Sequence, residues 1–181
     1  IQNYGGEDGI LEDLSDLYDS EEFASDELLE VFTEPATLDD SPYAMPAYGT
    51  TQVIYYNTQV LEEAGLNPDE VYSSWENVAE ASRVMIDEAG TNNGHMIMYG
   101  PDNLVDMALS NNGQILSDDG TEVLINSPEW VEAWDFAREQ IHETENMGVI
   151  SSGQGWEYWY STFDAVMTGT SGSYTGSSGD R

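Results

Sequence analysis

The sequence predicts an α/β or α+β lobe, in which helices alternate with short strands. Apolar residues recur at helical spacing in several segments, most clearly between Val78 and Ile86. Runs rich in β-forming residues lie between those segments, and Thr51–Tyr56 is the best of them. Hydrophobic residues make up 39% of the 181-residue chain and aromatic residues 11%, which indicates a packed core rather than disorder.

The part of the chain before Thr51 carries only short signals. Ile1–Tyr4 reads as the end of a strand and Gly5–Gly9 as a turn. Apolar residues at helical spacing between positions 10 and 17 predict a short helix, and Ser25–Glu27 reads as the start of another. The proline, aspartate and serine content of Pro35–Pro46 predicts a loop that acts as a hinge.

After the strand at Thr51–Tyr56, capping residues mark the ends of two helices. Asn57 begins a helix that Gly65 ends, and Ser74 caps a longer helix that runs to about Ala89. The sequence then predicts a strand over Gly94–Met98, a helix over Asp102–Ser110, a turn at Asn111–Gly113, a hairpin of Gln114–Leu116 and Val123–Ile125 around Asp118–Gly120, and a helix over Trp130–His142 opened by Ser127 and Pro128.

The last part of the chain is harder to assign from sequence. Trp156–Phe163 is expected to be helical or mixed, and Ala165–Met167 to be a short strand. Thr168–Gly179 is rich in glycine, serine and threonine, so we expect a loop there. We find no internal repeat.

The charge of the chain is extreme, with 36 acidic residues, three arginines, no lysine and a net charge of −33. Such a surface repels itself in ordinary salt, whereas at molar salt the Debye length falls to about 3 Å and the repulsion is largely screened. The acidic residues are spread among apolar periodic segments rather than gathered in blocks, which favours a folded, salt-adapted protein over a disordered acidic tail. Nucleic acid and anionic membrane surfaces are poor partners for this charge.

The chain has no cysteine, which excludes disulfides, thiolate metal sites and cysteine nucleophiles. It also has no run of about 20 apolar residues that would span a bilayer. Ile1 opens directly into a polar segment, so we expect no secretory signal within this sequence. We expect both ends to be cut from a longer chain.

No motif in the sequence predicts catalysis or metal binding. With 36 carboxylates, some pair will always suit a glycosidase, so such a pair carries little information. His95 is expected to be a satisfied core or surface residue and His142 to face a helix C-terminus, and neither lies in a metal-binding spacing. Asp118–Gly120 reads as a hairpin turn rather than a calcium loop. A phosphate-binding loop needs a lysine, and Ser171 lacks the glycines of a nucleophile elbow, so we expect no catalytic residue, metal or cofactor.

Two segments carry groups that suit a polar solute. Tyr48–Thr51 precedes a strand, and Thr168–Tyr174 is expected to follow one. Their hydroxyls and backbone N–H groups could bind sugar or phosphate oxygens, while aromatic rings stack on the apolar faces of sugars.

Several motifs, in order, resemble the family 1 extracellular solute-binding proteins, which are receptors of ABC importers. The segments that carry the resemblance are Gly49–Asn57, Leu61–Leu66, Trp75–Asn77, Leu109–Gly113, Asp118–Gly120, Asn126–Glu129 and Phe163–Met167, the last being similar to the family's "G-x-A-A-M" strand. The resemblance covers most of the chain from about Tyr43. Within the family, Met167-Thr168 and Ser171–Ser173 look most like the sn-glycerol-3-phosphate receptors, and receptors for oligosaccharides remain open.

The resemblance implies a periplasmic-binding-protein-like fold of type II, with two α/β lobes, each a mixed sheet flanked by helices, and the solute between them. Residues 1–47 would be the end of the first lobe and the crossover, and residues 48–181 the second lobe, incomplete at its C-terminus. By the same resemblance, Thr50 and Ser171 would bring hydroxyls to the ligand. The full set of expected ligand-binding residues is Tyr48, Gly49, Thr50, Thr51, Tyr99, Asn111, Ser171, Gly172 and Ser173.

The implied function is non-enzymatic capture of a sugar, an oligosaccharide or a glycerol-3-phosphate-like solute outside the cytoplasm of a halophile. Its partners would be the transmembrane permease subunits, and it would reach the membrane only through them or through a lipid anchor outside this segment. With one wall of the cleft, the 181-residue piece alone should bind weakly or not at all. Two alternatives stay open, a secreted halophilic glycoside hydrolase with an acid pair and a structural acidic cell-surface module.

Overall fold

The computed structural model describes residues 4–6, 9–20, 22–23 and 25–180. The chain divides into two units, Ile1–Thr51 and Gln52–Arg181. Tyr48–Thr51, which the resemblance assigns to the second lobe, therefore lie in the first of these units. None of the helices in the described ranges is long and apolar enough to cross a membrane.

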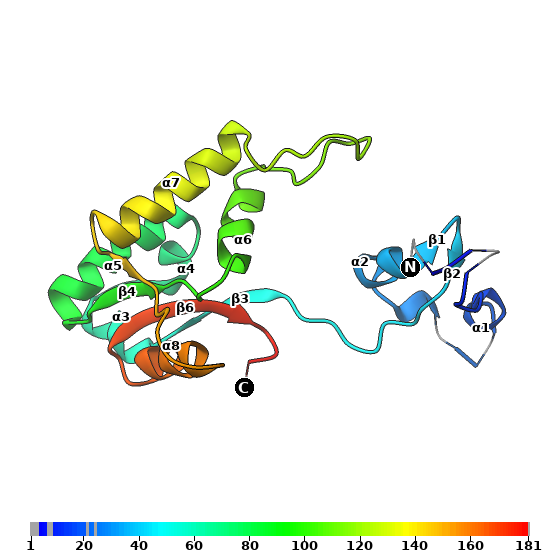
Figure 1. The fold of residues 1–181 in the computed structure, drawn as a ribbon. Helices are drawn as coiled ribbons and strands as arrows, with labels where there is room; N and C mark the ends of the chain where they lie inside the picture. The colour runs from blue at the N-terminus through cyan, green and yellow to red at the C-terminus, as the bar shows by residue number, and fades with distance from the viewer. Residues whose placement is uncertain (1–3, 7–8, 21, 24, 181) are drawn as a thin grey trace. The chain divides into compact units, whose positions relative to one another are not determined.

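The first unit consists of single turns and one very short hairpin (Figure 1). Its elements are α1 (Ser15–Tyr18), the 3₁₀ turn η1 (Ser25–Glu27), α2 (Glu30–Thr33), the 3₁₀ turn η2 (Glu34–Ala36), β1 (Thr37–Leu38) and β2 (Ser41–Pro42). Asp39 and Asp40 form the turn between the strands, with φ angles of 49° and 66°. The loop expected over Pro35–Pro46 thus contains this hairpin, which was not predicted.

Both helices predicted in the first unit are shorter than expected. The helix between positions 10 and 17 is the single turn α1, and the helix from Ser25 is split into η1 and α2. The strand end predicted at Ile1–Tyr4 and the turn at Gly5–Gly9 lie partly outside the described residues.

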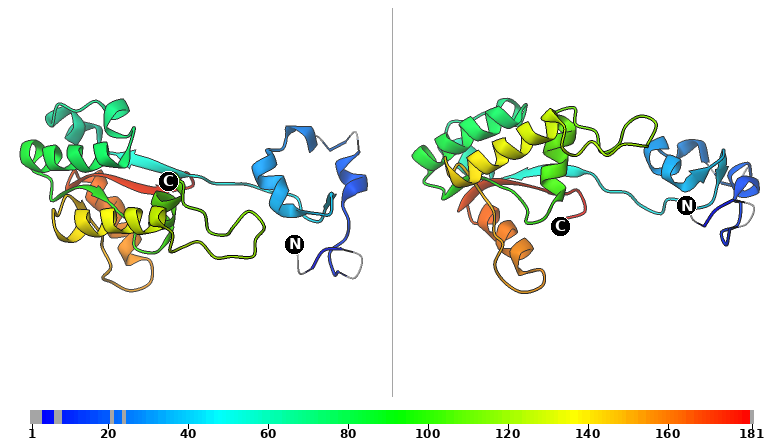
Figure 2. Two further views of the ribbon diagram at one scale, coloured as in Figure 1. Left: turned by 90° about the horizontal axis from the view of Figure 1, so that it is seen from above. Right: turned by 45° about the horizontal axis from the view of Figure 1, so that its top comes forward.

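The second unit is built on a four-stranded mixed sheet in the order β3-β6-β4-β5 (Figures 1 and 2). The strands are β3 (Gln52–Tyr56), β4 (Asn93–Met96), β5 (Met147–Gly148) and β6 (Ser171–Ser177). β6 runs antiparallel to β3 and parallel to β4, and β4 runs parallel to β5.

Helices cover both faces of this sheet, with α5 and α7 on one side and α8 on the other (Figure 1). The helices are α3 (Thr58–Glu63), α4 (Pro68–Val71), α5 (Trp75–Ala89), α6 (Asp102–Ser110), α7 (Pro128–His142) and α8 (Glu157–Met167). The largest apolar cluster lies under α5, α6 and α7, and contains Val78, Ala79, Ile97, Met107, Ala108, Trp130, Ala133, Ala137 and Met147. A smaller cluster joins Met96, Val166 and Tyr174 on the α8 side.

The helix boundaries that capping residues predicted are confirmed. The Asn57 side-chain oxygen accepts hydrogen bonds from the N–H groups of Gln59 (3.0 Å) and Val60 (3.2 Å) at the start of α3. Ser74 caps α5 by accepting from the Asn77 N–H at 3.2 Å, and Gly90 ends that helix in the left-handed conformation, with φ 70°. The predicted hairpin between residues 114 and 125 is reduced to a single antiparallel bridge between Leu116 and Val123.

Two predictions at the end of the chain are wrong. Ala165–Met167 is the last turn of α8 rather than a strand, and most of the loop expected over Thr168–Gly179 is the central strand β6. Residues 171–176 are buried, although none of them is aliphatic. An interior strand of a sheet that helices cover on both faces normally reads as a run of valine, isoleucine and leucine, and β6 was missed because it lacks that pattern.

The small residues of β6 allow the helices to lie close to the sheet. A Cβ atom added at Gly172 would collide with the Met85 side chain of α5. On the neighbouring strand, a Cβ atom at Gly94 would collide with the Ser82 backbone. Gly172 is therefore a packing residue.

Candidate ligand-binding site

The ends of three strands meet at one edge of the sheet in the second unit. β4, β5 and β6 are mutually parallel, so their carboxyl ends and the segments that follow them lie at the same edge. Gln52, the first residue of the antiparallel strand β3, pairs with Ser177 and belongs to this edge too. In open α/β sheets, ligands bind outside the carboxyl ends of the strands, so this edge is where a ligand pocket is expected.

A pocket of about 220 Å³ lies there, and we call it the aromatic pocket. The residues that line it are Gln52, Met98, Tyr99, Gly100, Asp102, Asn103, Trp156, Tyr158, Trp159, Thr175, Gly176, Ser177 and Asp180. They come from β3, from the segment after β4, from the start of α6, from the start of α8 and from the end of β6. The pocket is thus assembled from parts of the chain that are far apart in sequence.

Four aromatic rings line the pocket, those of Tyr99, Trp156, Tyr158 and Trp159. Tyr99 and Tyr158 meet edge to face, with ring centroids 5.5 Å apart, and Trp156 lies 6.3 Å from Tyr158. Trp159 stacks on Phe163, at 5.8 Å, and is held by α8. Trp156 is 69% exposed and Tyr99 53% exposed, so both rings are open to contact with a ligand. Such rings offer flat apolar faces.

The polar lining of the pocket includes two carboxylates, which are strong hydrogen-bond acceptors. Asp102 and Asp180 each contribute a carboxylate, while the Asn103 side-chain oxygen accepts from the Met98 N–H at 2.8 Å. That bond fixes the start of α6 against the segment after β4. Close by on α6, burial and then the charge of Asp102 raise the pKa of Asp106 above its ordinary value.

The position of Asp180 is set by the end of β6. Its Oδ2 accepts from the Ser177 N–H at 3.1 Å, and the Tyr55 hydroxyl lies 3.0 Å from the Asp180 carbonyl oxygen. A Cβ atom added at Gly176 would come within 2.6 Å of Asp180 Oδ2, so only glycine fits this arrangement. Burial, with smaller effects of Asp180 and Tyr55, raises the pKa of Tyr174 to about 12.

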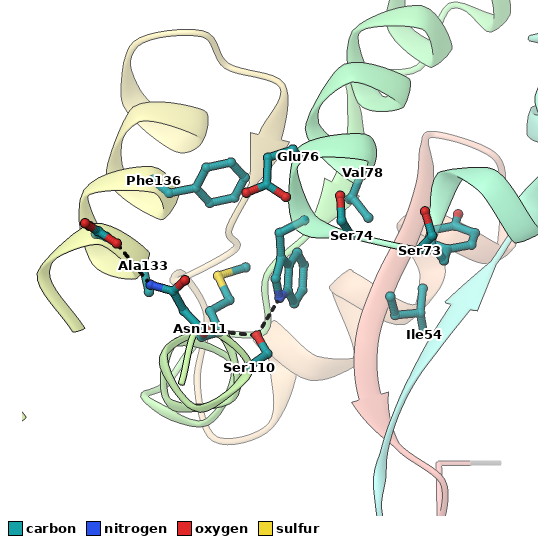
Figure 3. A pocket seen from close by; sticks show the side chains of 13 residues that line it. Ile54, Ser73, Ser74, Glu76, Val78, Ser110, Asn111, Ala133 and Phe136 are labelled. Atoms are coloured by element: carbon teal, nitrogen blue, oxygen red, sulfur yellow. Dashed lines mark hydrogen bonds between the residues drawn. The ribbon is translucent and has the colours of Figure 1, made fainter. Parts of the chain in front are cut away.

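A second, larger pocket lies on the helical side of the second unit, and we call it the Trp75 pocket (Figure 3). Its volume is about 530 Å³. It is formed by the start of α5, the end of α6, one side of α7, and Ile54 and Tyr72. The two pockets have no lining residue in common.

The residues predicted to bind ligand lie in four separate places in the structure. Tyr99 lines the aromatic pocket, and Asn111 lines the Trp75 pocket. Tyr48, Gly49, Thr50 and Thr51 are exposed in the first unit, in the segment that leads into β3. The Phe32 ring packs on Gly49, where an added Cβ atom would collide with it.

Ser171, Gly172 and Ser173 are buried in β6, so the expectation that they form an open loop is wrong. The Ser173 hydroxyl lies 2.9 Å from His95 Nδ1 and 3.2 Å from the Gly94 carbonyl oxygen. The Ser173 hydroxyl, which was expected to meet a ligand, is thus hydrogen-bonded inside the sheet. The strand expected within Phe163–Met167 is wrong as well, because this segment is the end of α8 and β6 begins only at Ser171.

Sequence reasoning missed the aromatic residues at the start of α8. Trp156, Tyr158, Trp159 and Tyr160 fall within five residues, and two of the five tryptophans of the chain are among them. This density of rings at a predicted helix start was the available signal. Asp180 was missed because it follows a strand that was read as a loop.

His95 is a core residue, as expected. It is fully buried, with Nδ1 2.9 Å from the Ser173 hydroxyl and Nε2 3.2 Å from the Thr175 hydroxyl. Burial lowers its pKa to about 3, so the ring is neutral. Within the described residues, no three His, Asp or Glu side chains are grouped in a way that could hold a metal ion.

The chain belongs to a known family of receptors. Residues 3–180 match the family described as bacterial extracellular solute-binding protein. This match covers both units and includes every residue of the aromatic pocket. No curated protein sequence matches the chain.

Solved structures of solute-binding proteins share the fold. The GacH receptor of Streptomyces glaucescens, solved unliganded and with acarbose, is similar with a TM-score of 0.76 and 15% identity, over 92% of this chain and 40% of that one. Lmo0181 from Listeria monocytogenes, solved with cycloalternan, gives 0.75 and 24%, over 92% and 42%. UgpB from Mycobacterium tuberculosis, solved with glycerophosphocholine, gives 0.71 and 20%, over 93% and 42%.

The similarity to these solved structures establishes the fold of the chain. The mixed sheet flanked by helices is that of the periplasmic-binding-protein-like receptors, as the sequence predicted. The chain spans about two fifths of the length of the structures that it resembles.

Proposed function

We propose that the protein is the solute-binding component of an ABC importer, and that this chain supplies one wall of its binding cleft. The observation that carries the proposal is the aromatic pocket, with two exposed rings at the carboxyl ends of the parallel strands. Family membership and the fold support the same reading. The protein would bind its solute without changing it, and no observation favours the glycoside hydrolase alternative.

The solute we propose is a sugar or oligosaccharide rather than a glycerol phosphate. The exposed faces of Trp156 and Tyr99 suit the apolar face of a sugar ring, and carboxylates such as those of Asp102 and Asp180 accept hydrogen bonds from sugar hydroxyls. A phosphate would meet those carboxylates instead of a positive charge. Arg83 and Arg138, the two arginines within the described residues, form salt bridges with carboxylates on α5 and around the end of α7.

The organisation of the whole protein remains a proposal from the family resemblance. Residues 1–47 would belong to the first lobe and the crossover, and residues 48–181 to the second lobe. Contacts to both lobes would favour a closed state in the presence of solute, which would then dock on the permease. The receptor would work outside the cytoplasm, held near the membrane by a lipid anchor or by the permease.

We also propose that the protein is adapted to high salt. A net charge of −33 on 181 residues opposes folding at low ionic strength, because neighbouring carboxylates repel one another across about 10 Å. Binding experiments should therefore be done in molar salt.

The test is a thermal-shift and calorimetric titration of the full-length protein in high salt against a panel of malto-oligosaccharides, sugar alcohols, glycerol 3-phosphate and glycerophosphodiesters. We expect a neutral carbohydrate to bind, and Trp156→Ala to weaken that binding about fivefold or more, since stacking on one ring contributes on the order of 1 kcal/mol. Trp134→Ala is the matched control, because Trp134 is an exposed tryptophan on α7 outside both pockets. Absence of binding across the panel would contradict the proposed function, and tight binding of glycerol 3-phosphate would contradict the proposed solute class.

A further inference from the structure

The Trp75 pocket has the size and the lining of a small-molecule site, although it lies apart from the aromatic pocket. Its volume of about 530 Å³ falls within the range of ligand pockets. Val78, Met107 and Ala133 are buried and form an apolar floor. Trp75 and Phe136 add aromatic rings above it.

Two carboxylates line this pocket without a cationic partner. Glu76 and Glu132 are exposed, and neither forms a salt bridge with the arginines of the described residues. Glu132 has one long contact, 3.4 Å from the Asn111 side-chain nitrogen, and Glu76 makes no side-chain hydrogen bond within the described ranges. In Figure 3, Phe136 and Glu76 lie on one side of the pocket, and Ser110 and Asn111 on the other.

The hydrogen-bond donors around the pocket are already used. The Trp75 indole N–H donates to the Ser110 hydroxyl at 3.2 Å, and that hydroxyl donates to the Met107 carbonyl at 2.9 Å. The Ser73 hydroxyl donates to the Glu70 carbonyl at 2.8 Å. The side-chain donor that this leaves open is the Ser74 hydroxyl, whose oxygen serves as the cap of α5.

The same is true of the remaining polar side chains. Asn111 donates to the Glu129 carbonyl at 3.0 Å and to Glu132, which leaves its side-chain oxygen as an acceptor. The Tyr72 hydroxyl is an exception, because no hydrogen-bond partner is found for it within the described residues, but its oxygen is buried and has no surface open to a ligand. The pocket therefore presents acceptors, negative charge and aromatic faces, with almost no side-chain donors.

The helix ends at the pocket partly explain this arrangement. The first turn of α5 favours a carboxylate at Glu76, because the N-terminal end of a helix carries partial positive charge. Glu132 lies beyond the first turn of α7, so the partial charge at a helix N-terminus does not explain a carboxylate at this position. The C-terminal end of α6, at Ser110, adds partial negative charge to the pocket.

We propose that the Trp75 pocket is a second binding site, for a small organic cation that carries a methylated ammonium group. The rings of Trp75 and Phe136 would contact the methyl groups through cation–π attraction, and Glu76 and Glu132 would neutralise the charge. An anion is excluded by the carboxylates. A neutral polyol fits less well, because its own acceptors would find few donors in the pocket.

The test uses choline as the probe and 3,3-dimethylbutan-1-ol, its neutral isostere, as the matched ligand control. Both are titrated by calorimetry into the full-length protein at a fixed, high salt concentration. We expect choline to bind at least about tenfold more tightly than the isostere, and the double variant Glu76→Gln/Glu132→Gln to lose about tenfold in affinity. Trp75→Leu should weaken binding as well.

Two control variants separate a built site from general attraction to an acidic protein. Glu62→Gln/Glu88→Gln removes the same charge from exposed positions outside both pockets, and it should change choline affinity less than twofold. Trp156→Ala should leave choline binding intact. Equal loss in the Glu62/Glu88 control, loss in Trp156→Ala, equal binding of the isostere, or no choline binding would each overturn the proposal. If the double variant fails to fold, Glu132→Gln alone carries the same expectation in direction.

Discussion

At the scale of single residues, the histidine inside the sheet links stability to pH. His95 is held neutral by burial between β4 and β6, with a pKa of about 3, whereas a histidine in an unfolded chain titrates near 6.5. Above pH 6.5 neither state binds the proton, so the folded state keeps its full stability. As the pH falls from 6.5 toward 3, the unfolded state binds a proton that the folded state cannot, and stability is lost.

We therefore predict that His95→Gln flattens the acid dependence of stability. Over that window the wild type should lose about 1.4 kcal/mol of unfolding free energy per pH unit more than the variant, since one proton is linked to unfolding. Chemical denaturation between pH 7 and pH 4 in high salt measures the difference between the two proteins. The many carboxylates titrate in both, so they cancel in the comparison. Parallel curves for the two proteins would show that His95 is not the linked group.

At the scale of elements, Asn57 joins two helices that are distant in sequence. Its side-chain oxygen caps α3, and its side-chain nitrogen donates to the Val166 carbonyl in α8 at 2.8 Å. One side chain thus forms hydrogen bonds with backbone groups of both α3 and α8, the helix that follows β3 and the helix that precedes β6. Loss of a cap alone costs about 1 kcal/mol, and the second bond adds to that.

We predict that Asn57→Ala lowers the unfolding free energy by about 2 kcal/mol, measured by denaturant unfolding in high salt. Asn92→Ala, at an exposed asparagine between α5 and β4, is the matched control and should stay within about 0.5 kcal/mol of the wild type. A loss at Asn57 no larger than that at Asn92 would contradict the assignment.

The helices and strands also show how much of the fold could be predicted from the sequence alone. α5 and α6 were predicted closely, because their caps and apolar spacing are local signals that tertiary structure reinforces. β6 was missed because its small and polar residues are accommodated in the interior by contacts with distant parts of the chain, such as the hydrogen bond to His95 and the packing of Met85 on Gly172, which no local pattern encodes. The residues of the candidate site differ in the same way, since some could be predicted from the sequence and others depend on contacts between distant segments. Tyr99 was expected from the family resemblance, whereas Trp156 and Asp180 enter the pocket only through the topology of the sheet.

At the scale of the whole molecule, charge is the dominant property. The net charge of −33 is spread over both units, and the Debye length falls from about 10 Å at 0.1 M salt to about 3 Å at 1 M. Repulsion among carboxylates thus lowers the stability of the folded protein at low salt, and salt can screen that repulsion.

We predict that the thermal midpoint of the full-length protein rises steeply with sodium chloride between 0.1 and 2 M. A variant in which exposed Glu62, Glu80 and Glu88 become glutamine should show a shallower rise and a higher midpoint at low salt, because less repulsion remains to be screened. Differential scanning calorimetry at several salt concentrations makes the comparison. A midpoint independent of salt, or a variant with the same slope as the wild type, would contradict salt adaptation.

The place of β6 in the chain has a consequence for the order in which the protein can fold during synthesis. Among the strands of the described residues β6 comes last in the sequence, yet it is the strand that joins β3 to β4. Within the part of the chain that the structure describes, β3 pairs only with β6, and β4 pairs only with β6 and the two-residue strand β5, so these pairings wait until residues 171–177 have left the ribosome. Folding of this lobe therefore depends on contacts between distant parts of the chain and is expected to be slow. This four-stranded arrangement therefore cannot be completed before β6 has been synthesised.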